Sequence, residues 1–324
     1  GQAYHDGMGF IQFYFGLPIA MVVICATFIP IYHRLKVFTA YEYLEQRFDL
    51  KTRSLAAILF LIQRGLGTGI TIYAPSIILS SLLGWNLTLM NIIIGVLVIV
   101  YTFSGGTKAV NVTQKQQMFV IMSGMFITFY LILHYLPNDM TFSNALNIAG
   151  ANGKMNIVDF SFDPETRYTF WSGITGGFFL ALSYFGTDQS QVGRYLSGKS
   201  IKESQMGLIM NGFLKVPMQF FILLLGILIF SFYQFNKAPI YFDQAKVLVA
   251  KQTIFKDSLN AIETSYDAAL AANAVDAATA LRVQYKAVLQ QALPGQDTND
   301  NNYIFLRFVM DYLPKGLIGL IIAI

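Results

Sequence analysis

The stretch "NIIIGVLVIVYTFSGGTKAVNVTQKQQMFVIMSGMFITFYLIL", Asn91 to Leu133, decides the fold class, because two long apolar runs flank a short polar segment. Each run approaches the roughly 20 residues that an α-helix needs to cross a bilayer. The polar segment holds the glycine pair Gly105 and Gly106, which permits a turn, and Thr113 and Gln116, which have capping-box spacing. We therefore expect two membrane helices joined by a turn, the second of them starting at Thr113.

The composition of the whole chain agrees with a membrane protein. Of 324 residues, 55% are hydrophobic and only 12% are charged, and the mean hydropathy is +0.51. A soluble domain has roughly 25% charged residues. The apolar residues occur in long runs without period-2 alternation, which favours spanning helices over a barrel. The histidines are scattered and the net charge is only +4, so we expect neither metal catalysis nor a nucleic-acid partner.

The hydropathy pattern predicts six complete spans and one span cut short by the end of the chain. They are 10–31, 54–82, 87–103, 117–136, 169–190, 206–233, and 313 to the end. Lys and Arg residues gather in alternate connections, for example between Arg34 and Arg53, so these connections are placed in the cytoplasm and the start of the chain outside. The chain lacks an initial methionine and ends in an apolar run, so we expect it to be a fragment.

The long connection 234–303 differs from the rest of the chain in composition. It is rich in alanine, carries apolar residues at helical spacing, and closes with "PGQDTNDNN". We expect a helical insertion on the extracellular or periplasmic side, within a single transmembrane domain of residues 1–324. An exposed structural insertion and a gating or partner-binding element both agree with this pattern.

Ionisable residues inside spans are functional candidates, because a charge in the bilayer is costly. Arg64, beside Gln63, interrupts the second span, Lys215 interrupts the sixth, and Asp188 lies near the inner end of the fifth. Each has a structural alternative. Arg64 could form an ion pair or snorkel, Lys215 could snorkel, and Asp188 could pair, for instance with Arg194.

Glycines are concentrated in the fifth span, which contains Gly173, Gly176, Gly177 and Gly186. Such a pattern is typical of a discontinuous helix whose free backbone groups bind an ion or a substrate, although close packing through small residues explains it equally. The sequence contains no nucleophile with a partnered base, no Walker loop and no dinucleotide fingerprint. These observations favour a transporter over an enzyme.

Five ordered segments of the chain carry a family resemblance. They are "FIPIYHRLKVFTAYEYLEQRF", "YTFSGGTKAVNVTQKQQ", "SYFGTDQSQVGRYLSGKSIKESQ", "GFLKVP" and "LPKGLIGLIIAI". Together they resemble the sodium:solute symporter family, which includes sodium/glucose, monocarboxylate, iodide and multivitamin transporters. The resemblance implies an all-α, LeuT-like bundle of five-plus-five inverted repeats in the cell membrane, of which this chain holds about core helices two to eight. The fifth span would then be the broken first helix of the second repeat.

The resemblance also implies a set of solute-path residues. Tyr14 stands where sugar transporters have a hydroxyl-binding glutamate, which disfavours a sugar, whereas Lys215 falls on a lysine that contacts sugar in a bacterial relative. Arg64 lies in the core helix where sialic acid transporters place a carboxylate-binding arginine. With Gln63 and Gln189 these residues form the expected solute path, and Gly176, Gly177 and Asp188 the expected broken helix or gate.

The expected function is sodium-coupled import of a small solute by alternating access. The branch resemblance and the intramembrane arginine favour an organic anion such as a monocarboxylate. A sodium/sugar symporter and a transporter-like sensor domain are the alternatives. The expected partners are the solute, the sodium ion and the lipid bilayer, and the sequence leaves the oligomeric state open.

Sodium binding is expected mostly outside this sequence. By resemblance, the main sodium site is built from residues before Gly1 and after Ile324. Relatives commonly carry an aspartate of a second sodium site where this chain has Gln114. A neutral amide cannot supply the charge of a carboxylate, so we expect no auxiliary site and one sodium ion per cycle.

Overall fold

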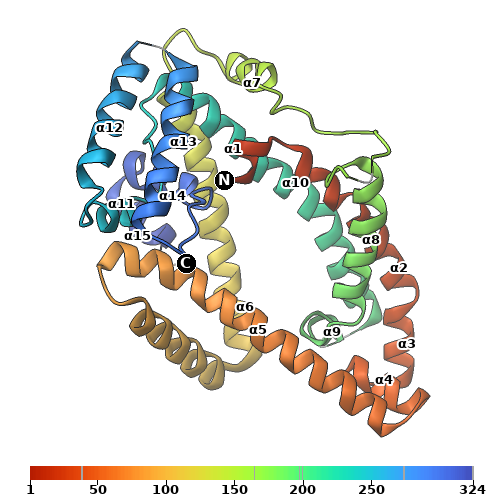
Figure 1. Cartoon of the computed structure of the whole chain (residues 1–324). Helices are drawn as coiled ribbons and strands as arrows, with labels where there is room; N and C mark the ends of the chain where they lie inside the picture. The colour runs from red at the N-terminus through yellow and green to blue at the C-terminus, as the bar shows by residue number, and fades with distance from the viewer. Residues whose placement is uncertain (38, 164, 197, 199, 273, 323–324) are drawn as a thin grey trace.

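The structure is a computed structural model that describes residues 1–37, 39–163, 165–196, 198, 200–272 and 274–322 (Figure 1). The side chains at 78, 81, 82, 107, 108, 275 and 320–322 are outside this description. All regular elements among the described residues are helices. They are α1 (Gln2–Asp6), η1 (Gly9–Tyr14), α2 (Gly16–Ala26), α3 (Phe28–Leu35), α4 (Ala40–Arg47), α5 (Leu50–Leu83), α6 (Leu87–His134), α7 (Phe142–Ala151), α8 (Phe170–Gly186), α9 (Gln189–Leu196), α10 (Ile201–Phe235), α11 (Gln244–Ala250), α12 (Lys256–Ala271), α13 (Val275–Ala292), α14 (Tyr303–Tyr312) and α15 (Lys315–Ile322).

Five segments of the described chain are long and apolar enough to cross a membrane. They are Gly9–Leu35, Leu50–Ile77, Leu87–Gly106, Ala109–His134 and Ile201–Phe235. Each corresponds to one of the predicted complete spans. The remaining predicted span, 169–190, corresponds to α8, which is apolar but has only 17 residues. The first span is interrupted, because η1, α2 and α3 follow one another at Phe15 and Thr27.

The turn predicted at the glycine pair is confirmed. The two halves of α6 meet at Gly106, whose backbone angles (φ 55°, ψ −163°) are open to glycine but rare for other residues, and the chain changes direction there (Figure 1). The prediction that Thr113 begins the second helix is wrong. Its hydroxyl donates to the carbonyl of Ala109 at 3.0 Å, so Thr113 lies inside a helix that has already started.

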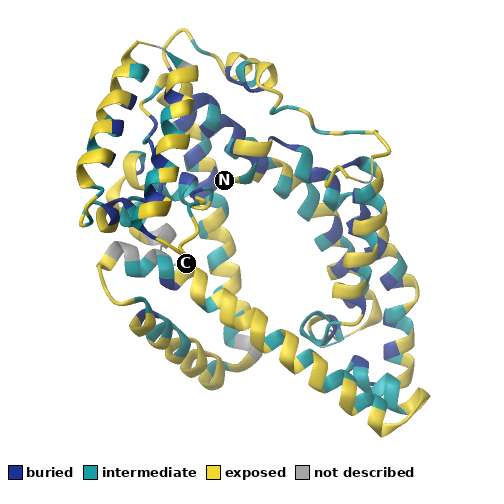
Figure 2. Ribbon diagram, viewed as in Figure 1, coloured by how far each residue is buried: buried dark blue, intermediate teal, exposed yellow. Residues whose placement is uncertain are grey.

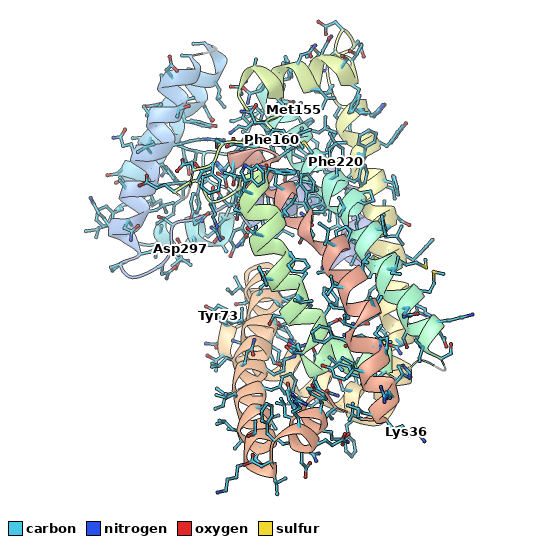
Figure 3. All side chains as sticks on the ribbon, turned by 90° about the vertical axis from the view of Figure 1, so that its right-hand side faces the viewer. Lys36, Tyr73, Met155, Phe160, Phe220 and Asp297 are labelled. Carbon is cyan, nitrogen blue, oxygen red and sulfur yellow. The ribbon has the colours of Figure 1, made fainter. Side chains whose placement is uncertain are left out.

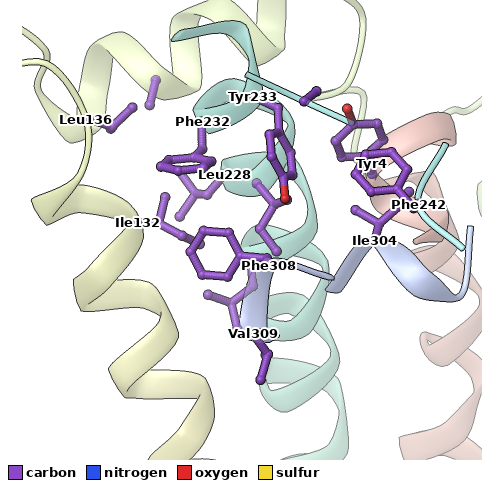
Figure 4. Packing of buried hydrophobic residues seen from close by; sticks show 14 of the residues in the cluster. Tyr4, Ile132, Leu136, Leu228, Phe232, Tyr233, Phe242, Ile304, Phe308 and Val309 are labelled. Atoms are coloured by element: carbon purple, nitrogen blue, oxygen red, sulfur yellow. The ribbon is translucent and has the colours of Figure 1, made fainter. Parts of the chain in front are cut away.

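Helix α10 connects two groups of buried residues. Its C-terminal half contributes Leu228 and Phe232 to a cluster with Ile132 of α6 and Phe308 of α14, all four of them fully buried (Figure 4). Its N-terminal half packs with α2, α3 and α9, where Met21, Ile24 and Ile29 are buried. Helix α5, in contrast, is exposed along most of its length (Figure 2).

The helices η1 and α2 lie directly against α8 because glycines line the contact. A methyl group on Gly173 would collide with the carbonyl oxygen of Gln12, and one on Gly177 with that of Phe13. The side chain of Gln12 is buried and adds hydrogen bonds, donating to the Tyr168 carbonyl at 3.1 Å and accepting from the Asp159 amide at 2.8 Å. This contact positions the end of η1 relative to α8.

Of the three residues expected at the helix break, Asp188 lies at an interruption of the helix, whereas Gly176 and Gly177 do not. Helix α8 runs through both residues without interruption, and Gly177 serves close packing while Gly176 is exposed. The chain leaves helical geometry at Thr187 and Asp188, before α9 begins at Gln189. Small residues alone do not distinguish a break from a contact, because both uses require the missing side chain.

Three helices, α11, α12 and α13, occupy most of the connection 234–303 and enclose their own core. Leu259, Tyr285 and Leu289 are almost fully buried in it. Asp300, which is 2% exposed, accepts hydrogen bonds from Lys286 Nζ at 2.7 Å and from the Phe242 amide at 2.9 Å. These polar contacts attach the two ends of the connection to its helices.

A pair of alanine substitutions tests the contact between η1 and α8. We expect Gly177→Ala to destabilise the protein by about 1–3 kcal/mol, because the new methyl group meets the Phe13 carbonyl and overpacks the contact. The matched control is Gly176→Ala on the same helix, where the methyl group meets open space and alanine is the better helix former. Thermal unfolding in detergent, followed by tryptophan fluorescence, measures both variants. Equal melting temperatures would contradict this packing.

Candidate functional site

A polar cavity of about 680 Å³ lies between α5, α8, α9 and α10. It brings together Arg64 of α5 and Lys215 of α10, two of the predicted solute-path residues that are far apart in the sequence. Its other lining residues are Tyr184, Phe185, Gln191, Arg194, Tyr195, Gly198, Glu203, Ser204, Gly207, Leu208 and Asn211. The volume lies in the range of small-molecule sites, and the cavity is open on one side and lined mainly by polar groups.

Arg64 is connected to Asp188 through a serine hydroxyl. The guanidinium Nη2 donates to Ser190 Oγ, and Ser190 Oγ donates to Asp188 Oδ1 at 2.5 Å. The backbone amide of Ser190 donates to the same carboxylate oxygen at 2.8 Å. The break between α8 and α9 thus supplies the partner of an arginine that comes from another span. The sequence suggested Arg194 as one possible partner of the Asp188 carboxylate, and the structure shows hydrogen bonds to that carboxylate from Ser190.

Lys215 lies against aromatic rings. Its Nζ is 5.6 Å from the ring centroid of Tyr14 and 5.9 Å from that of Phe185. Ring faces stabilise an ammonium group at this distance. Tyr14 is the last residue of η1, so the glycine-lined contact with α8 is what places its ring beside Lys215. The structure therefore brings Tyr14, Lys215 and Arg64 to one region.

The other predicted residues lie elsewhere. Gln63 is exposed, because neighbouring residues of a helix point about 100° apart and Arg64 takes the cavity side. Gln189 directs its side-chain carbonyl to the amide of Ala40, at 3.0 Å, and so joins α9 to the start of α4. Gln114 is exposed on α6. No group of three His, Cys, Asp or Glu side chains among the described residues could hold a metal ion.

Several lining residues were not predicted from the sequence. Asn211 precedes Lys215 by four residues on α10, so it lies on the same helix face, and this spacing was a usable signal. Gln191 donates to the Tyr184 hydroxyl at 2.8 Å, and both line the cavity. Ser190, which contacts Arg64 but does not line the cavity, could not be recognised from the sequence, because serine is common in polar segments. Burial raises the pKa of Tyr195, so its hydroxyl stays protonated.

The cavity is lined by three cationic side chains, Arg64, Arg194 and Lys215, and by one carboxylate, Glu203, so its excess of positive charge suits a small anion. Arg64 offers a planar fork of N–H donors that matches a carboxylate, and Lys215 offers a point charge. Gln191, Asn211 and Tyr184 add neutral hydrogen-bonding groups. Because the cations project from two different spanning helices, a bound anion would connect α5 with α10.

Comparisons with known proteins agree with this picture. Residues 1–255 match the family model described as sodium:solute symporter family. The human sodium/iodide cotransporter is 32% identical over 212 residues, which are 65% of this chain and 32% of that protein. The human sodium-coupled monocarboxylate transporter 1 is 34% identical over 210 residues, or 65% of this chain and 34% of that protein. The chain spans about a third of the length of the curated relatives it matches.

One solved structure resembles nearly the whole chain. It is a sodium-coupled sialic acid symporter in a substrate-bound outward-open state, with a TM-score of 0.68 and 22% identity, covering 99% of this chain and 67% of the other. This likeness confirms the predicted LeuT-like, all-helical fold. With five candidate spans, the chain is that of a multi-pass membrane protein. Since the family model matches 255 of its 324 residues, the chain belongs to the sodium:solute symporter family.

Proposed function

We propose that this protein imports a small organic anion, such as a monocarboxylate, together with sodium. The observation that carries the proposal is the convergence of Arg64 and Lys215 on one cavity of about 680 Å³ between spanning helices. A buried or half-buried cation is costly in a membrane. Its presence there is explained if an anionic solute binds beside it and compensates the charge. The relatives named for sodium-coupled transport of iodide and of monocarboxylates support an anionic solute and the same coupling ion.

The proposed transport cycle follows from the residues that hold the two cations. Ser190 fixes the guanidinium of Arg64 at the cavity wall, so its remaining N–H groups are free to grip a carboxylate. Tyr14 and Phe185 hold the ammonium of Lys215 without neutralising it. Sodium binding favours the outward-open state, the solute joins α5 to α10, and rocking of the two repeats exposes both to the cytoplasm.

A neutral sugar is the second candidate. Gln191, Asn211 and Tyr184 are neutral lining groups that can bind hydroxyls, and they do not require a charged solute. The two candidates differ in their use of Arg64, because a sugar gains little from a guanidinium and an anion gains a charge-assisted pair. A protein that binds solute but carries no flux would instead support a sensor.

The first test measures how the KM for the solute depends on Arg64. We expect Arg64→Ala to raise the KM of sodium-dependent organic anion uptake by about 10-fold to 100-fold, the loss of a charged hydrogen bond worth roughly 1.5–3 kcal/mol. Uptake of a labelled monocarboxylate into proteoliposomes holding the full-length protein measures it. Gln63→Ala is the matched control. Gln63 is the exposed neighbour of Arg64, so its replacement should change KM by no more than about twofold. Unchanged anion uptake in Arg64→Ala would rule out the proposed solute contact.

Ser190 is expected to act as a positioning residue for Arg64. In Ser190→Ala the guanidinium can turn to the Asp188 carboxylate and pair with it directly, so KM for the anion should rise about 5-fold to 10-fold while kcat changes less. Ser190→Thr restores the hydroxyl and should restore KM. Thr187→Val controls for the helix break, because the Thr187 hydroxyl bonds within α8 to Ser183. A fall in kcat with constant KM would oppose this role.

Gln114 leads to a prediction about charge balance. One sodium ion moved with one monoanion is electroneutral, so uptake should not respond to a membrane potential imposed with potassium and valinomycin. Two sodium ions would move one net charge, whose transfer is worth about 2.3 kcal/mol per 100 mV. We therefore expect initial uptake rates to agree at 0 and about −100 mV. Potential-driven uptake, or two sodium ions per solute by isotope flux, would contradict the loss of the second site.

A further inference from the structure

The insertion carries an aliphatic surface that packs against nothing in the described structure. Leu248 and Val249 of α11 are 66% and 49% exposed, and Ile254 in the following turn is 92% exposed. The neighbouring Val247 and Ala250 are buried in the insertion core. A short helix facing water would place polar residues on its outer side, whereas the most exposed residues of α11, Leu248 and Val249, are aliphatic. The outer side of this segment therefore needs an apolar environment.

The end of the insertion that holds α11 lies towards the membrane-spanning helix α5 (Figure 1). Asp243, the N-cap of α11, is close enough to Tyr303 of α14 for its charge to act on the Tyr303 hydroxyl. Burial is the main reason that the pKa of Tyr303 is raised to about 12. The charge of Asp243 and the hydroxyl of Tyr73 in α5 raise it further. In Figure 3, Tyr73 on α5 and Asp297 at the end of the insertion lie on the same side of the molecule. Figure 1 places α11 at the end of the insertion nearest α5.

The surface of α5 near this point is one that faces lipid. Leu66 and Ile70 project outward and are largely exposed within a segment that spans the membrane. Leu83 and Trp85 at the end of α5 are half exposed, and Trp is enriched at the level of the lipid headgroups. The aliphatic residues of α11 therefore continue a lipid-facing surface just past the end of a spanning helix.

The charges around the aliphatic residues agree with a lipid surface. Lys251 and Lys256 flank Ile254 in the sequence, and Lys251 pairs with Glu263 at 2.6 Å, which keeps its ammonium at the edge of the insertion. Lysine side chains beside buried aliphatic ones suit the boundary between acyl chains and headgroups, because their long stems reach the polar layer. A partner protein would be expected to bind a broader patch than one short helix and a turn.

We propose that residues 248–256 lie in the outer headgroup region of the membrane that holds the spans, with Leu248, Val249 and Ile254 inserted among the lipids. This contact gives the insertion a second attachment besides its chain ends. The insertion is then tethered to the bilayer beside α5 while α12 and α13 stay in water. The inference is independent of the transported solute.

Quenching of a single fluorophore tests the lipid contact. Ile254→Cys is made in the full-length protein after the other cysteines, Cys25 among them, are replaced, and it is labelled with a polarity-sensitive dye. Val283→Cys is the matched control. Val283 is 66% exposed on α13 and points about 200° away from the buried Tyr285, so it faces water. Both variants are reconstituted in vesicles of phosphatidylcholine and phosphatidylglycerol.

Two quenchers then separate the outcomes. We expect lipids brominated near the headgroup to quench the dye at 254 several-fold more than at 283, and aqueous iodide to show the reverse order. Similar iodide quenching at both sites would overturn the proposal. So would protection of position 254 from both quenchers, which indicates that protein covers it. Leu248→Cys provides an independent second site if one labelled variant fails to fold.

Discussion

The contact between η1 and α8 is the constraint on which the candidate site depends. Glycines let two backbones touch, so the end of one interrupted span is set against the middle of another. That contact places Tyr14 beside Lys215, and Phe185, the second ring at Lys215, lies two residues before the break that begins at Thr187. Backbone contact of this kind is rigid, because no side chain can adjust within it.

The break after α8 gives the site its polar partner. A free carboxylate and a free guanidinium in a low-dielectric region attract each other strongly, and a direct pair would cancel both charges. Ser190 stands between them and divides the interaction into two hydrogen bonds. The cation is thereby held in position while its charge stays partly available. Lys215 reaches a similar state through aromatic rings.

Two residues that line the cavity are also conspicuous in the sequence, and one cause explains both. Arg64 and Lys215 are conspicuous because charge is rare inside apolar runs, so each is found without knowledge of its neighbours. Gln63 and Gln189 are predicted to lie on the solute path because they are polar and close in sequence to ionisable residues. Neither lines the cavity in this structure, because Gln63 points outward and Gln189 bonds to the start of α4. The role of Ser190 could be recognised only in the structure, from its hydrogen bonds with Arg64 and Asp188.

Sequence alone determined the membrane character, the spanning segments and the turn at Gly106, because hydrophobic length and backbone freedom are local properties. The family resemblance was likewise readable from motifs, and the match over residues 1–255 agrees with it. Only the tertiary structure decided whether the glycines of α8 interrupt the helix or allow another helix to pack closely against it. It also decided which polar residues line the same cavity. Those outcomes depend on contacts between segments distant in the chain, which local patterns do not encode.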